Sequence, residues 1–213
     1  MIKSVKILIS YIGDLLFPPS CMLCGEYLGD SIYVCHDCLK DLPLNRNESK
    51  DHISVFDYGN GLRLMIHELK YNQRPEIGII LGKEAGRRLA GIIDPSHSVL
   101  VPVPLHKKRL RKRGYNQADL ICEGLASELS VPVNRYLLKR VKNNISQTTL
   151  NAEGRSANVK GIFDIFKTDT ERSKLILLVD DVITTGSTTK EAGAVLKNAG
   201  YLNYFALSIA TVK

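Results

Sequence analysis

Two adjacent carboxylates, Asp180 and Asp181, are shortly followed by hydroxyl side chains around one glycine. This hydroxyl segment consists of Thr184, Thr185, Gly186, Ser187 and Thr188. A carboxylate pair can accept hydrogen bonds from a vicinal diol, directly or through metal-bound water. Closely spaced amides and hydroxyls at the start of a helix can hold a phosphate, because unpaired N–H groups and the helix dipole favour an anion. The pattern predicts a site for a phosphorylated ribose; a structural turn, in which these residues only cap, is the alternative.

The residues around the acid pair predict how it is positioned. The apolar run Leu175–Val179 is too short for an ordinary helix and is typical of a buried parallel strand. Ligands of open α/β sheets bind beyond the carboxyl ends of such strands. We therefore expect Asp180 and Asp181 at a strand end, with Ser187 capping a helix over Thr188–Asn198.

The remaining pattern predicts an α/β fold. Strands are expected at Ile53–Tyr58, Ser98–Val103, Lys174–Val179 and Tyr204–Val212, and helices at Leu62–Lys70, Ile77–Ile93, Asn116–Ser130 and Thr188–Asn198. Alternation of this kind predicts a mostly parallel sheet flanked by helices. The 213 residues suit one such domain and a small module. The polar segment Asn45–Asp51 suggests the boundary, which gives domains at residues 1–48 and 49–213.

The cysteines predict the chemistry of the small module. Cys21 and Cys24 form one CxxC pair, and Cys35 and Cys38 form another ten residues later. Four thiolates in two short knuckles suit a tetrahedral, structural Zn²⁺ with every position filled by protein. Disulfides are the alternative for a secreted chain. Cys122 falls in a predicted helix and is expected in the core.

The most cationic segment is Lys107–Arg113, with six positive charges in seven residues. We expect it to be a loop at the sheet edge that carries Asp180, where it could meet pyrophosphate or a nucleic-acid backbone. A solvated basic loop is the alternative. Tyr115, Asn116 and Gln117 are compatible with base contacts, although Asn116 could instead cap the next helix. The predicted contacts to pyrophosphate or DNA are Lys70, His106, Lys107, Arg109, Arg113, Asn116 and Gln117.

These motifs carry a family resemblance. The acid pair and hydroxyl segment resemble the phosphoribosyl pyrophosphate (PRPP) loop of type I phosphoribosyltransferases. Further motifs resemble the competence protein F (ComF/ComFC) family in the expected order along the chain. They are the N-terminal CxxC pair, Leu69–Tyr71, Val101–Pro104, Arg113–Gln117, and Gln147 followed by Leu150, Arg155, Asn158 and Phe163.

The resemblance implies a type I phosphoribosyltransferase-like fold that binds PRPP with Mg²⁺ at Asp180–Thr188. It also implies a flexible loop with Gln147, Arg155 and Asn158 that closes over the ligand. One reading is an accessory protein of natural transformation that binds single-stranded DNA and has the DNA-uptake helicase as a partner. The other reading is an active phosphoribosyltransferase that passes ribose 5-phosphate to a nitrogen acceptor and releases pyrophosphate. We favour the first reading and leave catalysis open.

Charge and the N-terminus limit the partners. The net charge of +7 favours anionic partners such as nucleic acid, phosphorylated metabolites or acidic membranes. The apolar stretch Ile2–Phe17 is interrupted by Asp14 and followed by two prolines, which argues against a signal peptide and a membrane span. Its spacing predicts an amphipathic helix that packs on the protein itself, with peripheral membrane contact as the alternative. We expect a cytoplasmic protein.

Overall fold

The computed structural model describes residues 18–29, 31–46, 52–142, 161–167 and 169–212. Its contacts divide the chain into two compact units, Met1–Leu42 and Pro43–Lys213. Each unit is described separately. The predicted N-terminal helix and the predicted flexible loop with Gln147, Arg155 and Asn158 lie outside the described residues.

The described residues of the N-terminal unit form tight turns and a short helix, α2 (His36–Lys40). The Gly25 N–H donates to the Cys21 carbonyl over 2.8 Å, and Gly25 has a φ of +78°, a conformation that glycine adopts without strain. The Met22 N–H donates to the Tyr33 carbonyl over 2.9 Å and joins the two cysteine-bearing turns. Few apolar side chains are buried here, which is typical of a module that depends on a metal.

The larger unit contains a four-stranded parallel sheet with the order β1-β6-β5-β2. Its strands are β1 (His52–Asp57), β2 (Ser98–Pro102), β5 (Leu175–Ile183) and β6 (Tyr204–Thr211). Strands β3 (Leu138–Arg140) and β4 (Phe163–Ile165) form a separate antiparallel pair. The predicted α/β fold with a mostly parallel sheet is therefore confirmed.

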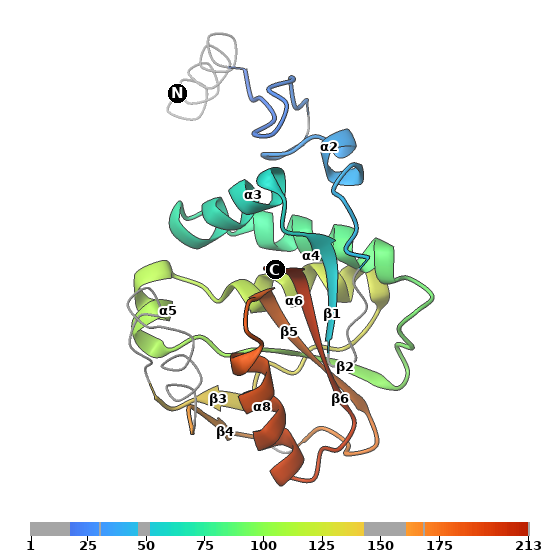
Figure 1. Ribbon diagram of the computed structural model, residues 1–213, viewed down its shortest axis with the longest axis vertical. Coiled ribbons are helices and arrows are strands. Elements are labelled where there is room, and N and C mark those ends of the chain that lie inside the picture. Colours follow the sequence, from blue (N-terminus) through green and yellow to red (C-terminus); the bar gives the residue numbers. More distant parts are fainter. Residues whose placement is uncertain (1–17, 30, 47–51, 143–160, 168, 213) are drawn as a thin grey trace, which may run out of the picture. The chain divides into compact units, whose positions relative to one another are not determined.

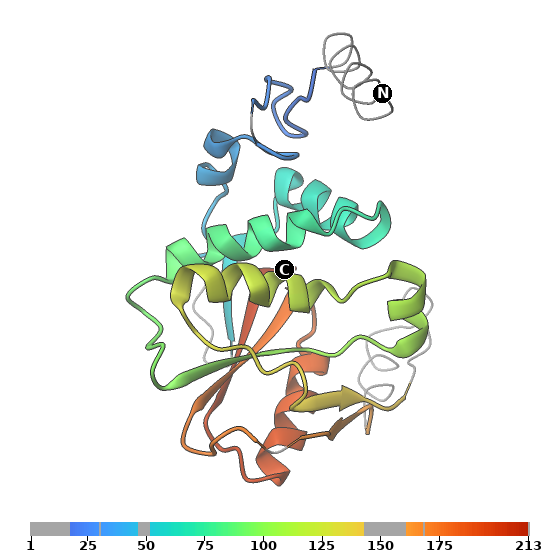
Figure 2. The same cartoon turned by 180° about the vertical axis from the view of Figure 1, so that it is seen from behind.

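Helices cover both faces of the sheet (Figures 1 and 2). They are α3 (Asn60–Tyr71), α4 (Glu76–Leu89), α6 (Gln117–Leu129) and α8 (Ser187–Asn198). Ile176 and Leu178 of β5 pack with Leu196 of α8 and with the β3–β4 pair. The alternate residues Leu177 and Val179 are also buried, because side chains alternate across a strand and both faces are covered.

Helices α4 and α6 approach until their backbones touch. A Cβ atom at Gly82 would lie 2.2 Å from the Ile121 carbonyl oxygen, and one at Gly124 would lie 2.2 Å from the Ile79 carbonyl oxygen. Only glycine fits at these two positions, because real Cβ contacts are never that short. Cys122 of α6 is fully buried beside this contact, which agrees with its predicted place in the core.

Three local predictions need correction. Strand β5 runs to Ile183, so the acid pair lies inside the strand and not after it, because Val182 and Ile183 still pair with β6. The basic run Lys107–Arg113 forms helix α5 and not a loop. The N-cap of α8 is Gly186, with a φ of +70°, and Ser187 is the first helical residue.

Residues between the cysteines and β1 join the sheet. The Asn45 N–H donates to the Val55 carbonyl over 3.0 Å, and the Asp57 N–H donates to the Pro43 carbonyl over 2.8 Å. The contacts thus place residues 43–45 with the larger unit, whereas the domain boundary expected from composition is at residue 48. Among the described helices, none has the length and apolar character that crossing a bilayer requires.

Candidate functional site

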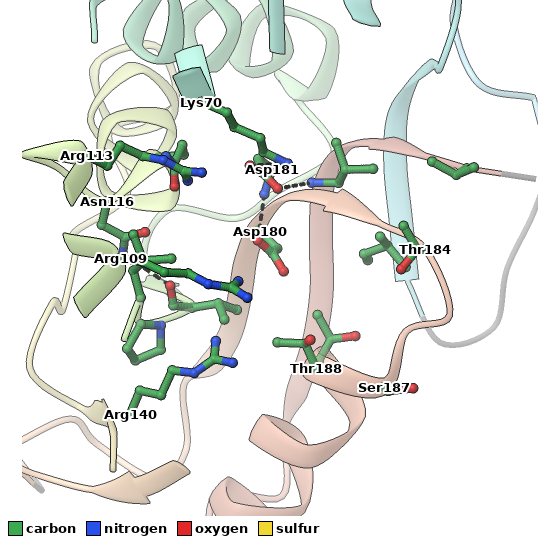
Figure 3. Close-up of a pocket in the computed structure, with 18 of the residues that line it drawn as sticks. Lys70, Arg109, Arg113, Asn116, Arg140, Asp180, Asp181, Thr184, Ser187 and Thr188 are labelled. Atoms are coloured by element: carbon green, nitrogen blue, oxygen red, sulfur yellow. Dashed lines mark hydrogen bonds and ion pairs between the residues drawn. The ribbon is translucent and has the colours of Figure 1, made fainter. Parts of the chain in front are cut away.

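A cavity of about 880 Å³ lies at the carboxyl ends of β2 and β5 in the larger unit (Figure 3). It brings together most of the residues singled out from the sequence. The lining residues among them are Lys70, Arg109, Arg113, Asn116, Gln117, Asp180, Asp181, Thr184, Thr185, Gly186, Ser187 and Thr188. Lys112 of the basic segment and Tyr71 of the Leu69–Tyr71 motif also line it. So do Tyr58 and Arg140, which the sequence analysis had not marked. Five cationic side chains therefore face two carboxylates around one cavity.

The acid pair is exposed to the cavity because the neighbouring strand ends before it. Pairing of β2 with β5 stops at Pro102 and Val179, while β6 continues alongside β5 to Ile183. The two carboxylates also fold back onto the chain. The Asp181 N–H donates to Asp180 Oδ1 over 2.9 Å, and the Val182 N–H donates to Asp181 Oδ1 over 2.7 Å. These bonds fix both side chains and leave the second carboxylate oxygen of Asp180 available to a ligand in the cavity.

Lys70 holds the second carboxylate. Its Nζ lies 2.8 Å from Asp181 Oδ2, and it comes from the last turn of α3 (Figure 3). Burial works against the charge of Lys70, but the attraction of Asp181 raises its pKa. Lys70, which was expected to contact pyrophosphate or DNA, thus neutralises a carboxylate of the site.

Asp180 has the most perturbed carboxylate of the site. Burial and the neighbouring Asp181 together raise its pKa to about 7, while Lys70 acts in the opposite direction. A carboxyl with this pKa is partly protonated near neutral pH. It can therefore change its charge when a cation or a diol arrives.

This pKa predicts a pH-dependent stability. Folded Asp180 keeps its proton up to about pH 7, whereas the unfolded chain loses it near the ordinary aspartate pKa of 3.8. Its contribution to stability is therefore full below pH 4 and is lost as pH rises through 7. Between pH 4.5 and 8, we expect the free energy of unfolding of wild type to fall by on the order of 2 kcal/mol relative to that of Asp180→Asn. Urea unfolding of both proteins at several pH values measures this, and parallel curves would contradict it.

The hydroxyl segment forms the wall next to the acid pair. Gly186 turns the chain into α8, and the Thr185 and Ser187 hydroxyls lie 2.7 Å apart. The Thr189 hydroxyl donates to the Gly186 carbonyl over 3.0 Å. The first amides of a helix have no acceptor within that helix. The amides and hydroxyls at the start of α8 can therefore bind an anion in the cavity.

The opposite wall is cationic (Figure 3). Arg109 and Arg113 come from α5, and Arg140 comes from the end of β3. Within the described part of the chain, none of the three forms an ion pair with a carboxylate. Arg140 Nε is buried and has no hydrogen-bond partner among the described residues. Burial lowers the pKa of Arg140, and the repulsion of Arg109 lowers it further. Such a wall is suited to a multiply charged anion.

Other predicted residues have different surroundings. His106 and Lys107 are not among the residues that line the cavity. His106 is the N-cap of α5, where its Nδ1 accepts from the Lys108 N–H over 3.2 Å. Asn116 Nδ2 donates to the Val103 carbonyl over 3.1 Å, so it ties α6 to the end of β2 and does not cap the helix with its side chain.

The four predicted cysteines come together in the N-terminal unit. The sulfur atoms of Cys21, Cys24, Cys35 and Cys38 all lie within 4.8 Å of one another. Cys21 Sγ accepts the N–H groups of Leu23 and Cys35, each over 3.4 Å. Burial opposes the thiolate of Cys21, but these amides and that of Cys24 lower its pKa to about 6. Four sulfur ligands supported by amides fit a tetrahedral zinc ion.

Comparison with known proteins agrees with this geometry. Residues 12–49 match the double zinc ribbon domain family. A DNA utilization protein YhgH from Salmonella typhi is 33% identical over 84% of this chain and 78% of its own length. Competence protein F from Haemophilus influenzae is 33% identical over 85% of this chain and 80% of its own. The chain belongs to the competence protein F (ComFC) family. Competence protein ComFC of Bacillus subtilis is 30% identical over 84% of this chain and 72% of its own length.

Membership of the ComFC family confirms the resemblance inferred from the motifs, and the zinc ribbon agrees with the four-cysteine cluster. Among solved structures, an allosteric regulatory enzyme of purine biosynthesis aligns with 78% of this chain at 18% identity and a TM-score of 0.43, and the chain spans about a third (32%) of that enzyme. Adenine phosphoribosyltransferase from Trypanosoma brucei aligns with 82% of this chain and 78% of its own, at 11% identity and a TM-score of 0.39. Likeness at this level carries no ligand over to this chain.

Proposed function

We propose that this ComFC family protein binds PRPP with Mg²⁺ in the cavity and acts in DNA uptake during natural transformation, in the cytoplasm. The observation that carries the proposal is the division of the cavity into two walls. The acid pair and the start of α8 form one wall. Arginines that pair with no carboxylate of the described residues form the other. A ligand that joins a diol to several phosphates satisfies both walls at once.

The walls suggest how PRPP lies. Its 5′-phosphate fits the start of α8, where amides and hydroxyls are available. Its ribose diol fits Asp180, whose second oxygen accepts no hydrogen bond from the described residues. Its pyrophosphate fits the cations Arg109, Arg113 and Arg140. Lys70 already neutralises Asp181, so the carboxylates alone do not form a complete magnesium site. In this proposal Mg²⁺ enters as part of the PRPP complex.

Calorimetric titration of PRPP with Mg²⁺ tests the proposal. We expect one site per chain, and we expect ribose 5-phosphate to bind more weakly because it lacks the pyrophosphate that the arginines would hold. Removing Arg140 by Arg140→Leu should lower PRPP affinity more than ribose 5-phosphate affinity. No heat of binding from PRPP, in protein that remains folded by circular dichroism, would contradict the proposal.

The part played in DNA uptake is proposed from the family. Relatives of this chain carry the names competence protein F and DNA utilization protein. Helix α5 supports a nucleic-acid contact, because it has no buried residue and is almost entirely cationic. We propose single-stranded DNA as one partner and the DNA-uptake helicase as another.

The cations of α5 divide between two faces. Arg109, Lys112 and Arg113 line the cavity, whereas Lys107, Lys108 and Arg111 do not. A helix turns by about 100° per residue, which places these two sets on opposite sides. We infer that the first set serves the phosphorylated ligand and that the second set is free to meet DNA.

This division predicts separable effects. Replacing Lys107, Lys108 and Arg111 by Ala should weaken binding of single-stranded DNA and reduce the salt dependence of log K by about 2, since each lost phosphate contact contributes about 0.7. PRPP affinity should stay the same. Fluorescence anisotropy of a labelled oligonucleotide at several salt concentrations measures the slope. Replacing the exposed Arg63, Lys83 and Lys197 by Ala removes the same charge elsewhere. Equal losses of DNA affinity in both triple variants would show that only the net charge of the protein matters for DNA binding.

An active phosphoribosyltransferase is the second candidate function. It is favoured by the cavity arginines that form no ion pair within the described residues, because groups that hold pyrophosphate in PRPP can also stabilise it as a leaving group. Phosphorus NMR of the titrated sample, with nucleobases and amines added, distinguishes the two. Release of pyrophosphate that depends on an acceptor would establish transfer, and binding without release would favour a ligand-dependent uptake factor.

A further inference from the structure

Two exposed aromatic rings lie at one end of the antiparallel β3–β4 ribbon, which comprises residues 136–141 and 162–167. Tyr136 is 59% exposed and Phe166 is 55% exposed. Two of the four exposed tyrosine and phenylalanine side chains among the described residues therefore belong to this ribbon. Single exposed apolar side chains are ordinary on a protein surface, but rings that gather in one place indicate a site of interaction.

Backbone hydrogen bonds hold both rings in the ribbon. The Phe166 N–H donates to the Leu137 carbonyl over 2.9 Å, and the Lys167 N–H donates to the Tyr136 carbonyl over 3.0 Å. These bonds continue the register of β3 and β4 by two cross-strand pairs. Because adjacent pairs point to opposite faces of a ribbon, Tyr136 lies on one face and Phe166 on the other.

A lysine lies over each ring. Lys167 Nζ is 5.1 Å from the centre of the Tyr136 ring, and Lys139 Nζ is 5.5 Å from the centre of the Phe166 ring. Counted with the flanking residues 135, 142 and 161, the ribbon carries five cations and one carboxylate. This carboxylate, Asp164, pairs with Lys139 over 3.2 Å at the surface, where water and salt weaken such a pair. The ribbon therefore offers rings for bases and cations for phosphates.

The ribbon continues the cationic surface of α5. It carries Arg140, which lines the cavity together with Arg109 of α5. Figures 1 and 2 both show the ribbon below α5. The strand from residue 136 to residue 140 spans about 13 Å, since a strand rises about 3.3 Å per residue. The rings therefore lie within reach of a single strand of nucleic acid bound to α5.

The rings add a property that the cations of α5 lack. Cations bind the phosphates of single-stranded and duplex DNA alike. Bases of a single strand are open to stacking on aromatic side chains, whereas bases of a duplex are held inside the helix. A surface that combines cations with exposed rings therefore favours the single strand.

We propose that the β3–β4 ribbon, through Tyr136 and Phe166, is the surface that selects single-stranded over duplex DNA. One base stacks on each ring, and the lysines over the rings contact the neighbouring phosphates. The proposal rests on the proposed role in DNA uptake and names the part of the chain that distinguishes the two forms of DNA.

Paired titrations test the ribbon. A labelled oligodeoxythymidylate and a labelled duplex of the same length are titrated by fluorescence anisotropy. Each stacked base contributes about 5- to 150-fold to affinity, so the double variant Tyr136→Ala, Phe166→Ala should bind the single strand more than about 10-fold more weakly. Duplex affinity should stay unchanged. The double variant Tyr136→Phe, Phe166→Tyr keeps both rings and should bind like wild type.

The salt dependence distinguishes stacking from charge. The alanine variant removes no cation, so the slope of log K against log salt should remain that of wild type. The triple variant of α5 should instead lower this slope. Tyr27→Ala is the matched control, because it removes a 69% exposed tyrosine from the N-terminal unit, and it should bind DNA normally. Circular dichroism checks that each variant is folded.

A fluorescent variant reports the contact directly. The chain contains no tryptophan, so Tyr136→Trp places a single indole on the ribbon. Quenching by oligodeoxythymidylate but not by the duplex would support stacking. Emission that stays constant at saturating oligodeoxythymidylate would place the bound strand elsewhere and overturn the proposal.

The outcomes separate this proposal from the proposed role in DNA uptake. If wild type binds the single strand and the alanine variant binds it equally well, the ribbon does not select DNA, and its rings serve a protein partner. Equal affinity of wild type for single strand and duplex would also overturn the ribbon and leave DNA as a partner. If wild type binds neither, DNA as a partner falls together with the ribbon.

Discussion

Replacing Asp180 and Asp181 together by Asn should abolish measurable PRPP binding while the protein remains folded. Each carboxylate can accept a charge-assisted hydrogen bond worth about 1.5–3 kcal/mol, so losing both predicts an affinity loss of more than about 100-fold. The asparagine oxygens can still accept the amides of Asp181 and Val182, which should preserve the strand. Calorimetry with PRPP and Mg²⁺ measures the loss, and circular dichroism measures the fold.

Single variants and a control sharpen this result. Asp180→Asn should lower PRPP affinity more than Asp181→Asn, because Asp180 is not engaged with Lys70. Asp181 is already paired with Lys70, and Asp181→Asn leaves Lys70 without this partner. Asp164→Asn changes an exposed carboxylate of β4 that pairs with Lys139 outside the lining of the cavity, and should bind PRPP normally. Unchanged PRPP affinity in the double variant would remove the acid pair from the site.

Replacing Cys21 and Cys24 by Ser should remove zinc and unfold the N-terminal unit. Metal binding supplies much of the folding free energy in modules of this kind, on the order of 10 kcal/mol, and two remaining thiolates cannot replace a four-sulfur site. The larger unit has its own core and should keep its parallel sheet. Metal analysis should fall from one zinc per chain to near zero, and limited proteolysis should release fragments from the first 42 residues only.

Cys122→Ala is the matched control, because this buried thiol of α6 is not part of the four-cysteine cluster. It should retain zinc and the protected N-terminal unit. Wild-type protein purified without chelator but lacking zinc would contradict the assignment of the cluster to zinc.

Much of the fold could be predicted because its strands are buried on both faces. The runs at β2 and β5 are continuous and apolar, and the structure places strands there. The end of β5 could not be predicted, since aspartate disfavours strands and only pairing with β6 extends β5 through the acid pair. Helix α5 escaped prediction for a related reason. It has one apolar residue in seven, so it shows no hydrophobic periodicity.

The site was predictable where its residues belong to motifs along the chain, and not at isolated positions. The acid pair and the hydroxyl segment are neighbours along the chain, and the structure keeps them together. Arg140 was missed because one arginine at the end of Leu-Leu-Lys-Arg carries no signal, and it reaches the cavity only through the position of β3. The pairing of Lys70 with Asp181 joins residues more than a hundred positions apart, so spacing could not reveal it.

The backbone contact between α4 and α6 limits how this protein can respond to a ligand. Helices that meet at Gly82 and Gly124 cannot slide without a clash or a void, so α6 is a fixed support for Gln117 and Asn116. Helix α5 buries no residue and has no such restraint. Any narrowing of the cavity around an anion should therefore come from α5 swinging against a stationary α6, with Gly114, at a φ of +87°, as the hinge.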